Sequence, residues 1–314
     1  MAGTRKGAKV NRRLVHCTAG LAACLSVLWA LAPARTAPQP QADATARSWN
    51  QAVAPFRIVG NIYYVGANEI TAFLMVTPAG DMVLDGGFVE TAPQIEANIQ
   101  RLGFRLSDVK ILLNSHAHSD HAGGLAELKR ATGAAFYASA ADAPMLESGG
   151  HGDFAFGDRL TFPPVKPDHL VDDGDTVRLG ATVLTAHLTP GHTKGCTTWT
   201  TTVEENGASH LVAFVCSTSV PSGYRLVGNS AYPEIADDYA KTFRILRSLP
   251  CDIFLGSHGS FFGLTEKREA LASRPNSNPF VDPGGYQAFV DRSEAAFREE
   301  LRRQQELAKA KTKD

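Results

Sequence analysis

The sequence predicts a layered α/β fold, and three observations carry that prediction. Apolar, β-branched runs alternate with amphipathic helical stretches, as expected when strands and helices pack in layers. A coarse pattern of strands, a helix and further strands occurs twice, and no Pro/Gly/Ser-rich linker interrupts residues 50–310. The composition is that of a globular protein, with 44% hydrophobic and 20% charged residues. We therefore expect one domain.

The N-terminal segment is expected to be a secretory signal rather than part of the fold. Five basic residues precede an apolar, Ala- and Leu-rich run at 14–32, and Ala32-Pro33-Ala34 offers a small-x-small cleavage site. An anchoring helix fits the run less well. Lipidation at Cys24 also fits less well than cleavage of a secretory signal, because the apolar run continues beyond that cysteine. We expect a signal peptide at 1–34, a disordered, Pro/Ala-rich lead-in at 35–47 and a single folded domain at 48–314.

Charge and export limit the classes of partner. Without residues 1–34 the chain has 26 Lys and Arg residues against 32 Asp and Glu residues, a net charge of about −6. This balance favours solubility and gives no indication of nucleic-acid binding. We expect a periplasmic or secreted monomer that has no stable membrane insertion after the signal is removed.

Three cysteines remain after the signal, and export permits a disulfide. Cys196 directly precedes a strand predicted at 197–202, and Cys216 directly follows one predicted at 210–215. If these strands form a hairpin around Asn206-Gly207, the two thiols lie side by side. We therefore expect a Cys196–Cys216 bond and a free Cys251, although the sequence alone does not fix the pairing.

The first half of the chain should begin with an antiparallel meander of three strands, at 58–65, 71–76 and 82–87. A helix should follow at 91–102, with Thr91 as its cap and Gly103 as its end. The remaining elements alternate, as layered α/β folds require, and are predicted in the order strand 109–113, helix 125–132, strand 135–138.

Residues 149–168 contain several Phe and Pro residues, and are either a packed surface loop or an aromatic flap near a site. After this loop, the second half of the chain should contain four strands, then two helices with a fifth strand between them. The predicted elements are strands 176–179, 182–189, 197–202 and 210–215, helix 232–248, strand 253–255 and a charged helix 286–308.

The richest chemistry directly follows the buried strand at 109–113. Three histidines and a carboxylate lie within six residues, namely His116, His118, Asp120 and His121. Neutral imidazoles and a carboxylate at this density suit a divalent metal of the Zn²⁺ type. His192 and His258 also follow apolar strands, and their Gly or Pro neighbours let the chain bend at a strand end. The sequence therefore predicts a metal site at one edge of a sheet.

The His-x-His-x-Asp-His run at 116–121, the Gly-His-Thr at 191–193 and the strand-end His258 together resemble the metallo-β-lactamase superfamily. The resemblance covers residues of about 48 to 310. It implies a four-layer αβ/βα sandwich, in which two mixed β-sheets lie face to face with helices on the outer faces. The metals would lie at one edge, between the two halves.

One position separates the activities of this superfamily. Hydrolases such as glyoxalase II and the lactonases usually have a metal-bridging Asp after the strand that follows Gly-His-Thr. Here that strand leads into Cys216-Ser217-Thr218-Ser219, which contains no carboxylate. The pattern is most similar to the B3 subclass of metallo-β-lactamases. One departure is Tyr286, which stands where some members have the cysteine that would pair with Cys251.

The resemblance implies two zinc ions per chain. The first would be bound by His116, His118 and His192, and the second by Asp120, His121 and His258. A metal-bridging hydroxide would attack the lactam carbonyl, with Asp120 as ligand and orienting group. Ser217 and Ser219 would bind the substrate carboxylate. Asp85 either holds the ligand loop, as a family carboxylate does, or caps a turn.

The expected function is zinc-dependent hydrolysis of the β-lactam amide bond of penicillins, cephalosporins and carbapenems, which gives antibiotic resistance. The alternative is another metal-dependent hydrolase of the superfamily, a lactonase or a thioesterase such as glyoxalase II. A non-catalytic metal-binding protein would require a broken ligand set, and all six candidate ligands are in place.

Overall fold

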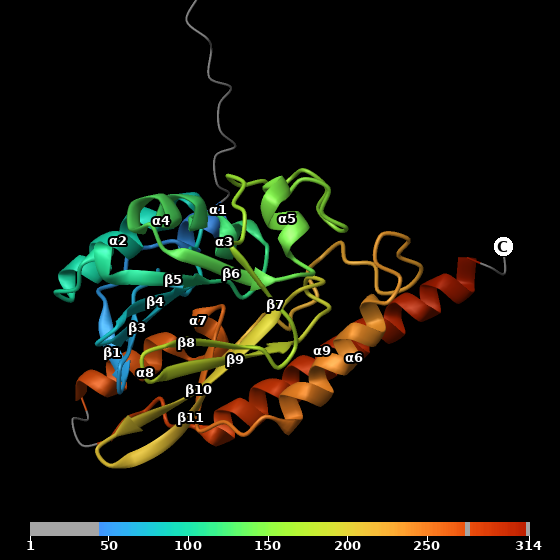
Figure 1. Ribbon diagram of the computed structural model, residues 1–314. Helices are drawn as coiled ribbons and strands as arrows, with labels where there is room; N and C mark the ends of the chain where they lie inside the picture. Colours follow the sequence, from blue (N-terminus) through green and yellow to red (C-terminus); the bar gives the residue numbers. More distant parts are fainter. Residues whose placement is uncertain (1–43, 274–276, 312–314) are drawn as a thin grey trace, which may run out of the picture. The chain divides into compact units, whose positions relative to one another are not determined.

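The computed structural model describes residues 44–273 and 277–311, so the expected signal at 1–34 lies outside them. The described residues form two mixed β-sheets of seven and five strands, with helices on their outer faces (Figure 1). The layered α/β sandwich expected from the sequence is confirmed. In the described part of the chain, no helix is long and apolar enough to cross a membrane.

The first sheet has its strands in chain order, β1 to β7. Strands β1 to β4 pair antiparallel, as the expected meander requires, and β4 to β7 pair parallel. The strands are β1 Phe56–Val59, β2 Ile62–Tyr64, β3 Phe73–Thr77, β4 Gly80–Leu84, β5 Val109–Leu113, β6 Ala135–Ser139 and β7 His169–Val171. The helices of this half are α1 Ala44–Trp49, α2 Ala92–Arg101, α3 Ser119–Ala122, α4 Leu125–Thr132 and α5 Ala143–Ser148, with 3₁₀ turns Val89–Thr91 and Leu106–Asp108.

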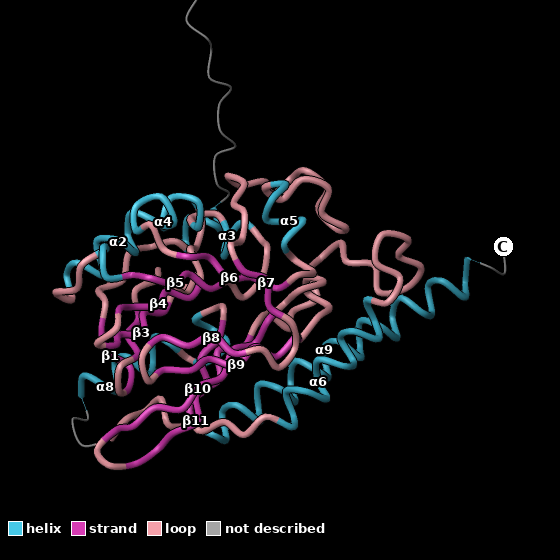
Figure 2. The backbone as a smooth tube through the Cα atoms, viewed as in Figure 1, coloured by secondary structure: helices cyan, strands magenta, loops and turns pink. Residues whose placement is uncertain are grey.

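The second sheet has the order β12-β11-β10-β9-β8, with only the β11–β12 pair parallel. Its strands are β8 Thr176–Leu179, β9 Thr182–Leu188, β10 Thr197–Glu205, β11 Ala208–Val215 and β12 Ile253–Gly256. The helices of this half are α6 Ile235–Ser248, α7 Gly259–Phe262, α8 Leu264–Ser273 and α9 Pro283–Lys311. Figure 2 shows the strands in the middle layers, with α2 and α4 on one side and α6 and α9 on the other.

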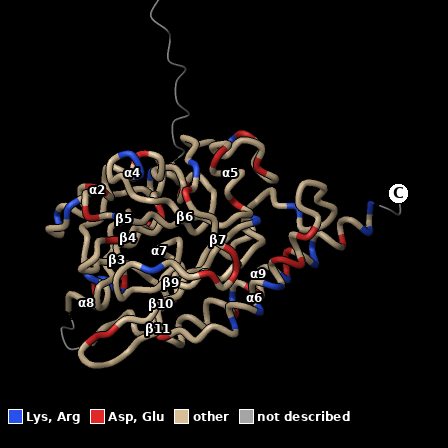
Figure 3. Tube along the Cα trace, viewed as in Figure 1, with Lys and Arg blue, Asp and Glu red and all other residues tan. Residues whose placement is uncertain are grey.

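The alternation of side chains along each strand divides the apolar residues between two cores. In β4, Met82 and Leu84 belong to the cluster that includes Trp199 of the second sheet, whereas Val83 belongs to the cluster that includes Ile95 of α2. Charged residues are instead frequent on α6 and α9, and the central strands are mostly uncharged (Figure 3). Packing of the two inner faces brings the ends of strands from both sheets together.

Three local expectations are corrected by the structure. Residues 58–65 do not form one strand, because the chain turns at Gly60, where φ is +49°, and pairs β1 with β2. Thr91 does not cap α2 with its side chain; its hydroxyl accepts a hydrogen bond from the Phe88 backbone N–H. Residues 44–47 of the expected lead-in belong to α1.

The disulfide expectation is met in the structure, where Cys196 and Cys216 are bonded and Cys251 is a buried free thiol. Strands β10 and β11 form the predicted hairpin, with positive φ at both Asn206 and Gly207. Burial raises the pKa of Cys251 to about 12, so this thiol is poorly reactive at neutral pH.

Candidate metal centre

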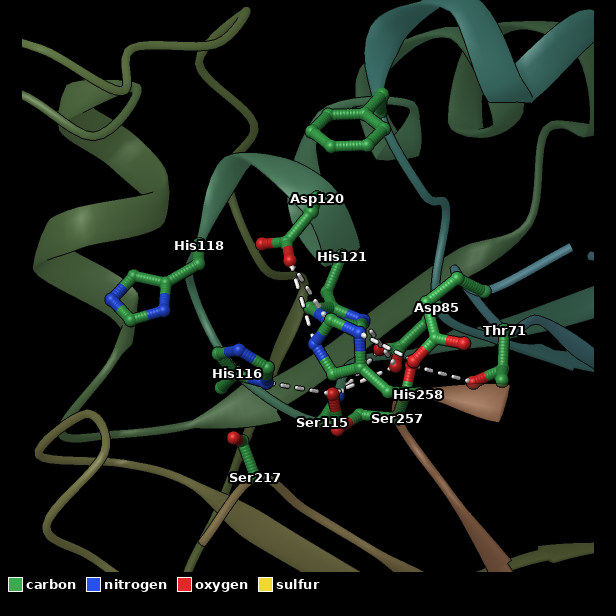
Figure 4. Close-up of polar contacts among 12 residues, drawn as sticks. Thr71, Asp85, Ser115, His116, His118, Asp120, His121, Ser217, Ser257 and His258 are labelled. Carbon is green, nitrogen blue, oxygen red and sulfur yellow. Dashed lines mark hydrogen bonds and ion pairs between the residues drawn. The ribbon is translucent and has the colours of Figure 1, made fainter. Parts of the chain in front are cut away.

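All six candidate ligands lie where loops from both sheets meet. His116 and His118 follow β5, and Asp120 and His121 lie on the short helix α3 immediately after them. His192 lies on the loop between β9 and β10, and His258 directly follows β12. Figure 4 shows His116, Asp120, His121 and His258 close together, with His118 to the left of them. The structure thus brings together every metal-ligand candidate that the sequence predicts.

The first set of donors consists of three buried imidazoles. His118 Nδ1 lies 3.1 Å from His192 Nε2. One donor atom from each of His116, His118 and His192 lies within 4.8 Å of the others. Three ligands held about 2.1 Å from a tetrahedral metal are about 3.4 Å apart, so this set can close around a zinc ion.

The second set has two nitrogen donors and one oxygen donor. His121 Nε2 lies 3.4 Å from both His258 Nε2 and Asp120 Oδ2, and His258 Nε2 lies 3.6 Å from Asp120 Oδ2. This triangle also has the size expected of ligands on one zinc ion, about 3.4 Å on each side.

A third group of donors does not form a metal site. His116 lies near the sulfur atoms of Cys196 and Cys216. Zinc binds thiolates, but these two sulfurs are joined in the disulfide and offer none. Cys216 therefore offers no thiolate to a metal in this structure.

The outer hydrogen bonds of two histidines fix which ring nitrogen faces the metal position. His192 Nδ1 lies 2.9 Å from the Ser219 carbonyl, which can only accept, so His192 Nε2 carries the lone pair. Ser115 donates its hydroxyl proton to Asp85 at 2.7 Å and therefore accepts from His116 Nδ1 at 3.0 Å. His116 Nε2 is then a buried acceptor that has no hydrogen-bond partner among the residues the structure describes. An orphaned, inward-facing lone pair is what a metal site requires.

Electrostatics keep most of these groups in their ligating forms. Burial lowers the pKa of His116 and His192 well below the usual range, and that of His258 to about 4. Burial alone would raise the pKa of Asp120, but the facing His121 and His258 outweigh it and hold the pKa well below its usual range. His121 is different: burial opposes its charge, but Asp120 and Asp85 raise its pKa to about 10. A metal bound at the second set must therefore displace a proton from His121.

Asp85 holds the ligand loop and does not serve only as a turn cap. Its carboxylate accepts hydrogen bonds from Asn114 Nδ2, the Ser115 backbone N–H and the Ser115 hydroxyl. Its Oδ2 also lies 3.4 Å from His121 Nδ1. Asp85 adopts a φ of +67°, which is uncommon for a residue other than glycine and is maintained by these contacts.

A second buried carboxylate, Asp142, joins the two ligand loops of the first set. It accepts hydrogen bonds from the Ala117 backbone N–H at 3.0 Å, the Thr193 hydroxyl at 2.7 Å and the Gly195 backbone N–H at 2.7 Å. Ala117 lies between His116 and His118, and Thr193 follows His192. One side chain therefore sets the distance between loops from different sheets.

The ligands open into a cleft of about 280 Å³. The expected substrate residues differ in position, because Ser219 lines this cleft whereas Ser217 is buried, with its hydroxyl 3.0 Å from that of Ser219. Apolar walls come from Trp49, Phe88, Phe156, Leu160 and Pro221. Phe156 of the 149–168 loop lies at the cleft, as the aromatic-flap alternative requires, whereas Phe162 of the same loop packs in the core, as the packed-loop alternative requires.

Sequence reasoning did not identify several residues that support the site. Tyr224 donates a hydrogen bond to the His192 carbonyl at 2.7 Å, and the ring of Trp49 lies 5.3 Å from that of His258. Asp142 and Asp153 also touch the ligand loops without being in them. None of these residues belongs to a ligand motif, and each reaches the site only through the tertiary fold.

Two face-to-face mixed sheets with two candidate donor sets at one edge match the arrangement that the sequence resemblance implies for a metal-dependent hydrolase. The chain belongs to the metallo-beta-lactamase superfamily, whose family profile matches residues 65–258. Among curated proteins, it is 30% identical over 204 residues to a hydroxyacylglutathione hydrolase of Nitrobacter hamburgensis, which covers 65% of this chain and 67% of the relative.

Other curated similarities are shorter. A hydroxyacylglutathione hydrolase of Fuscovulum blasticum is 35% identical over 106 residues, 34% of this chain and 33% of the relative. A probable metallo-hydrolase of Burkholderia pseudomallei is 34% identical over 120 residues, 38% of this chain and 39% of the relative. The chain therefore spans well under half of the length of these two relatives.

This chain matches nearly the whole length of several similar solved structures. The FEZ-1 metallo-beta-lactamase of Legionella gormanii has a TM-score of 0.80 and 43% identity, over 82% of this chain and 98% of that one. The subclass B3 enzyme BJP-1 of Bradyrhizobium japonicum has a TM-score of 0.78 and 39% identity, over 83% and 98%. The class B3 di-zinc enzyme LRA-12 from an Alaskan soil metagenome has a TM-score of 0.77 and 34% identity, over 83% and 98%.

Proposed function

We propose that this protein is a di-zinc β-lactamase of the B3 type, which hydrolyses the amide bond of β-lactam antibiotics and thereby gives resistance. The observation that carries the proposal is the end of β11. There the chain provides the disulfide-bonded Cys216 and the hydroxyls of Ser217 and Ser219, where a bridging Asp is usual in glyoxalase II and lactonases. The similarity to solved B3 enzymes over nearly their whole length supports the same reading.

The residues have distinct tasks in this proposal. The first zinc is assigned to His116, His118 and His192, and the second to Asp120, His121 and His258. Two zinc ions, when bound, supply Lewis acids and lower the pKa of a coordinated water. Asp120 stays ionised beside His121, so its carboxylate can both ligate and accept a hydrogen bond that orients the attacking water.

The cleft provides substrate contacts of two kinds. Ser219 lines the cleft, so its hydroxyl can donate to a substrate carboxylate, and the Ser217 hydroxyl lies 3.0 Å from it. Trp49, Phe156 and Leu160 give apolar walls that exclude water around a bound ring system. We assign a small-molecule β-lactam as the substrate on this basis.

A thioesterase is the second candidate, because several curated relatives are hydroxyacylglutathione hydrolases. The two candidates are separated by measuring turnover of a carbapenem, a cephalosporin and a hydroxyacylglutathione thioester with the same zinc-loaded protein. We expect kcat/KM for at least one lactam to exceed that for the thioester by about 100-fold or more. A chelator should abolish the lactam activity. Turnover of the thioester alone would replace the proposal with its alternative.

Export is part of the proposal, with cleavage after Ala34 releasing the enzyme into the periplasm or medium. The Cys196–Cys216 bond supports export, because disulfides persist in oxidising compartments. The intact mass of the exported protein, denatured and alkylated without reductant, should be that of a chain starting at Arg35 with one alkyl group, on Cys251. Three alkyl groups would contradict the disulfide, and a retained N-terminal segment would contradict cleavage.

A further inference from the structure

Each imidazole of the first set has an oxygen atom behind it, on the side away from the metal position. For His116 this is the Ser115 hydroxyl, and for His192 it is the Ser219 carbonyl. His118 differs from them because its inner atom is Nδ1, 3.1 Å from His192 Nε2. The outer atom of His118 is therefore Nε2, and the group that faces it decides whether Nδ1 is free to ligate.

Asp153 faces this outer atom. It comes from the loop between α5 and β7, and its side chain is only 7% exposed. Its Oδ2 lies 3.7 Å from His118 Nε2. The hydroxyl oxygen of Tyr224 lies 3.4 Å from the same nitrogen and donates its own proton to the His192 carbonyl, so it too can only accept from His118. Two acceptors thus surround the outer nitrogen.

The carboxylate of Asp153 is fixed in this orientation by its own loop. Oδ1 accepts hydrogen bonds from the backbone N–H groups of Ala155 at 2.8 Å and Phe156 at 2.6 Å. Oδ2 is consequently the oxygen that turns toward His118. The ring of Phe156 lies 5.6 Å from the His118 ring and lines the cleft. One carboxylate therefore joins a wall of the cleft to a candidate ligand.

We propose that Asp153 is a positioning residue that holds the proton of His118 on Nε2 and so leaves the Nδ1 lone pair free for the first metal. The proposal rests on the proposed function in one respect, since it takes His118 as a metal ligand. Outer carboxylates of this kind fix the orientation of a ligating histidine and raise its basicity. Asp153 touches neither the metal position nor the substrate cleft.

The variant Asp153→Asn tests the proposal with little change in shape. Because the Ala155 and Phe156 N–H groups require an acceptor, the amide oxygen should take the place of Oδ1. The amide NH₂ then faces His118 Nε2 and donates to it, which favours the proton on Nδ1, the atom that must ligate. We expect the zinc affinity of the first set to fall by about 10- to 100-fold.

Asp158→Asn is the matched control, because Asp158 lies on the same loop and loses the same charge but is 69% exposed and pairs with His151. Zinc affinity is measured by chelator competition on the wild type and both variants, independently of any activity. In the metal-free wild type, long-range ¹H–¹⁵N spectra should place the His118 proton on Nε2, with the ring assigned by comparison with His118→Gln.

The outcomes separate the two hypotheses. A wild-type protein that binds no zinc would overturn the proposed function itself. If the wild type binds zinc, then equal affinity in Asp153→Asn would overturn the role of Asp153. A wild-type His118 with its proton on Nδ1 would do the same, and this spectrum does not depend on whether the variant folds. Weakened binding in Asp153→Asn and unchanged binding in Asp158→Asn would support the role.

Discussion

Replacing Asp120 with alanine should reduce the zinc content from two ions per chain to one and lower lactam turnover by at least about 100-fold. Asp120 Oδ2 is the oxygen donor of the second set, 3.4 Å from His121 Nε2 and 3.6 Å from His258 Nε2. Without it, two imidazoles remain, and three protein ligands are usual for a catalytic zinc ion. The substitution also removes the carboxylate that orients the attacking water.

The variant needs a control for the loss of one negative charge. Asp158→Ala makes the same change at an exposed position of the 149–168 loop and should retain both zinc ions and full turnover. Zinc is measured by elemental analysis of the purified proteins, and turnover is followed with a chromogenic cephalosporin. Wild-type turnover in Asp120→Ala would refute the assignment of Asp120, whatever the zinc content.

The candidate ligands could be selected from the sequence, and the structure places them together, because each one is attached to a local pattern. His116 and Asp120 belong to one short run that follows a strongly apolar strand, and His192 and His258 each follow a strand and have Gly or Pro neighbours. Parallel strands and a sheet-to-sheet core deliver such ends to a common edge. The family resemblance then supplied the division of the ligands between two metals, which the spacing alone does not contain.

The residues that support the candidate ligands through hydrogen bonds could not be predicted in the same way. Asp142 lies in sequence far from Gly195, and the two meet only because β6 and the β9–β10 loop come together at the site. Position 195 requires glycine, because a Cβ atom there would lie 2.0 Å from Ser139 Oγ and 2.5 Å from the Asp142 backbone nitrogen. A close approach of this kind leaves no periodic signal in the sequence.

The first two strands of the first sheet show how hydrophobicity alone can hide a turn. Residues 58–65 are almost continuously apolar or aromatic, which predicts a single buried strand. The chain reverses instead at Gly60-Asn61, and the Asn61 side chain donates a hydrogen bond to the Val76 carbonyl at 2.8 Å. The Gly60-Asn61 pair between the two apolar runs is itself a two-residue hairpin signal, so this turn could have been predicted from the sequence.

The largest expected effect on stability is that of Asp142→Ala. The substitution leaves three donors without their acceptor, at a position where Asp142 and Thr193 are both buried: the backbone N–H groups of Ala117 and Gly195 and the hydroxyl of Thr193. Each buried unsatisfied donor costs about 1–3 kcal/mol, so we expect the free energy of unfolding to fall by about 3 kcal/mol or more. Urea denaturation in the presence of a chelator measures this without any contribution from bound zinc.

Thr193→Val is the graded comparison for this variant, because it removes one donor and leaves the carboxylate with two. It should cost about 1 kcal/mol in the same denaturation experiment. If Asp142 joins the two ligand loops, its loss should also weaken zinc binding to the first set more than Thr193→Val does, because Ala117 and Gly195 are then both released. Equal unfolding free energies for the two variants would mean that Asp142 does not hold His116 and His118 against the His192 loop.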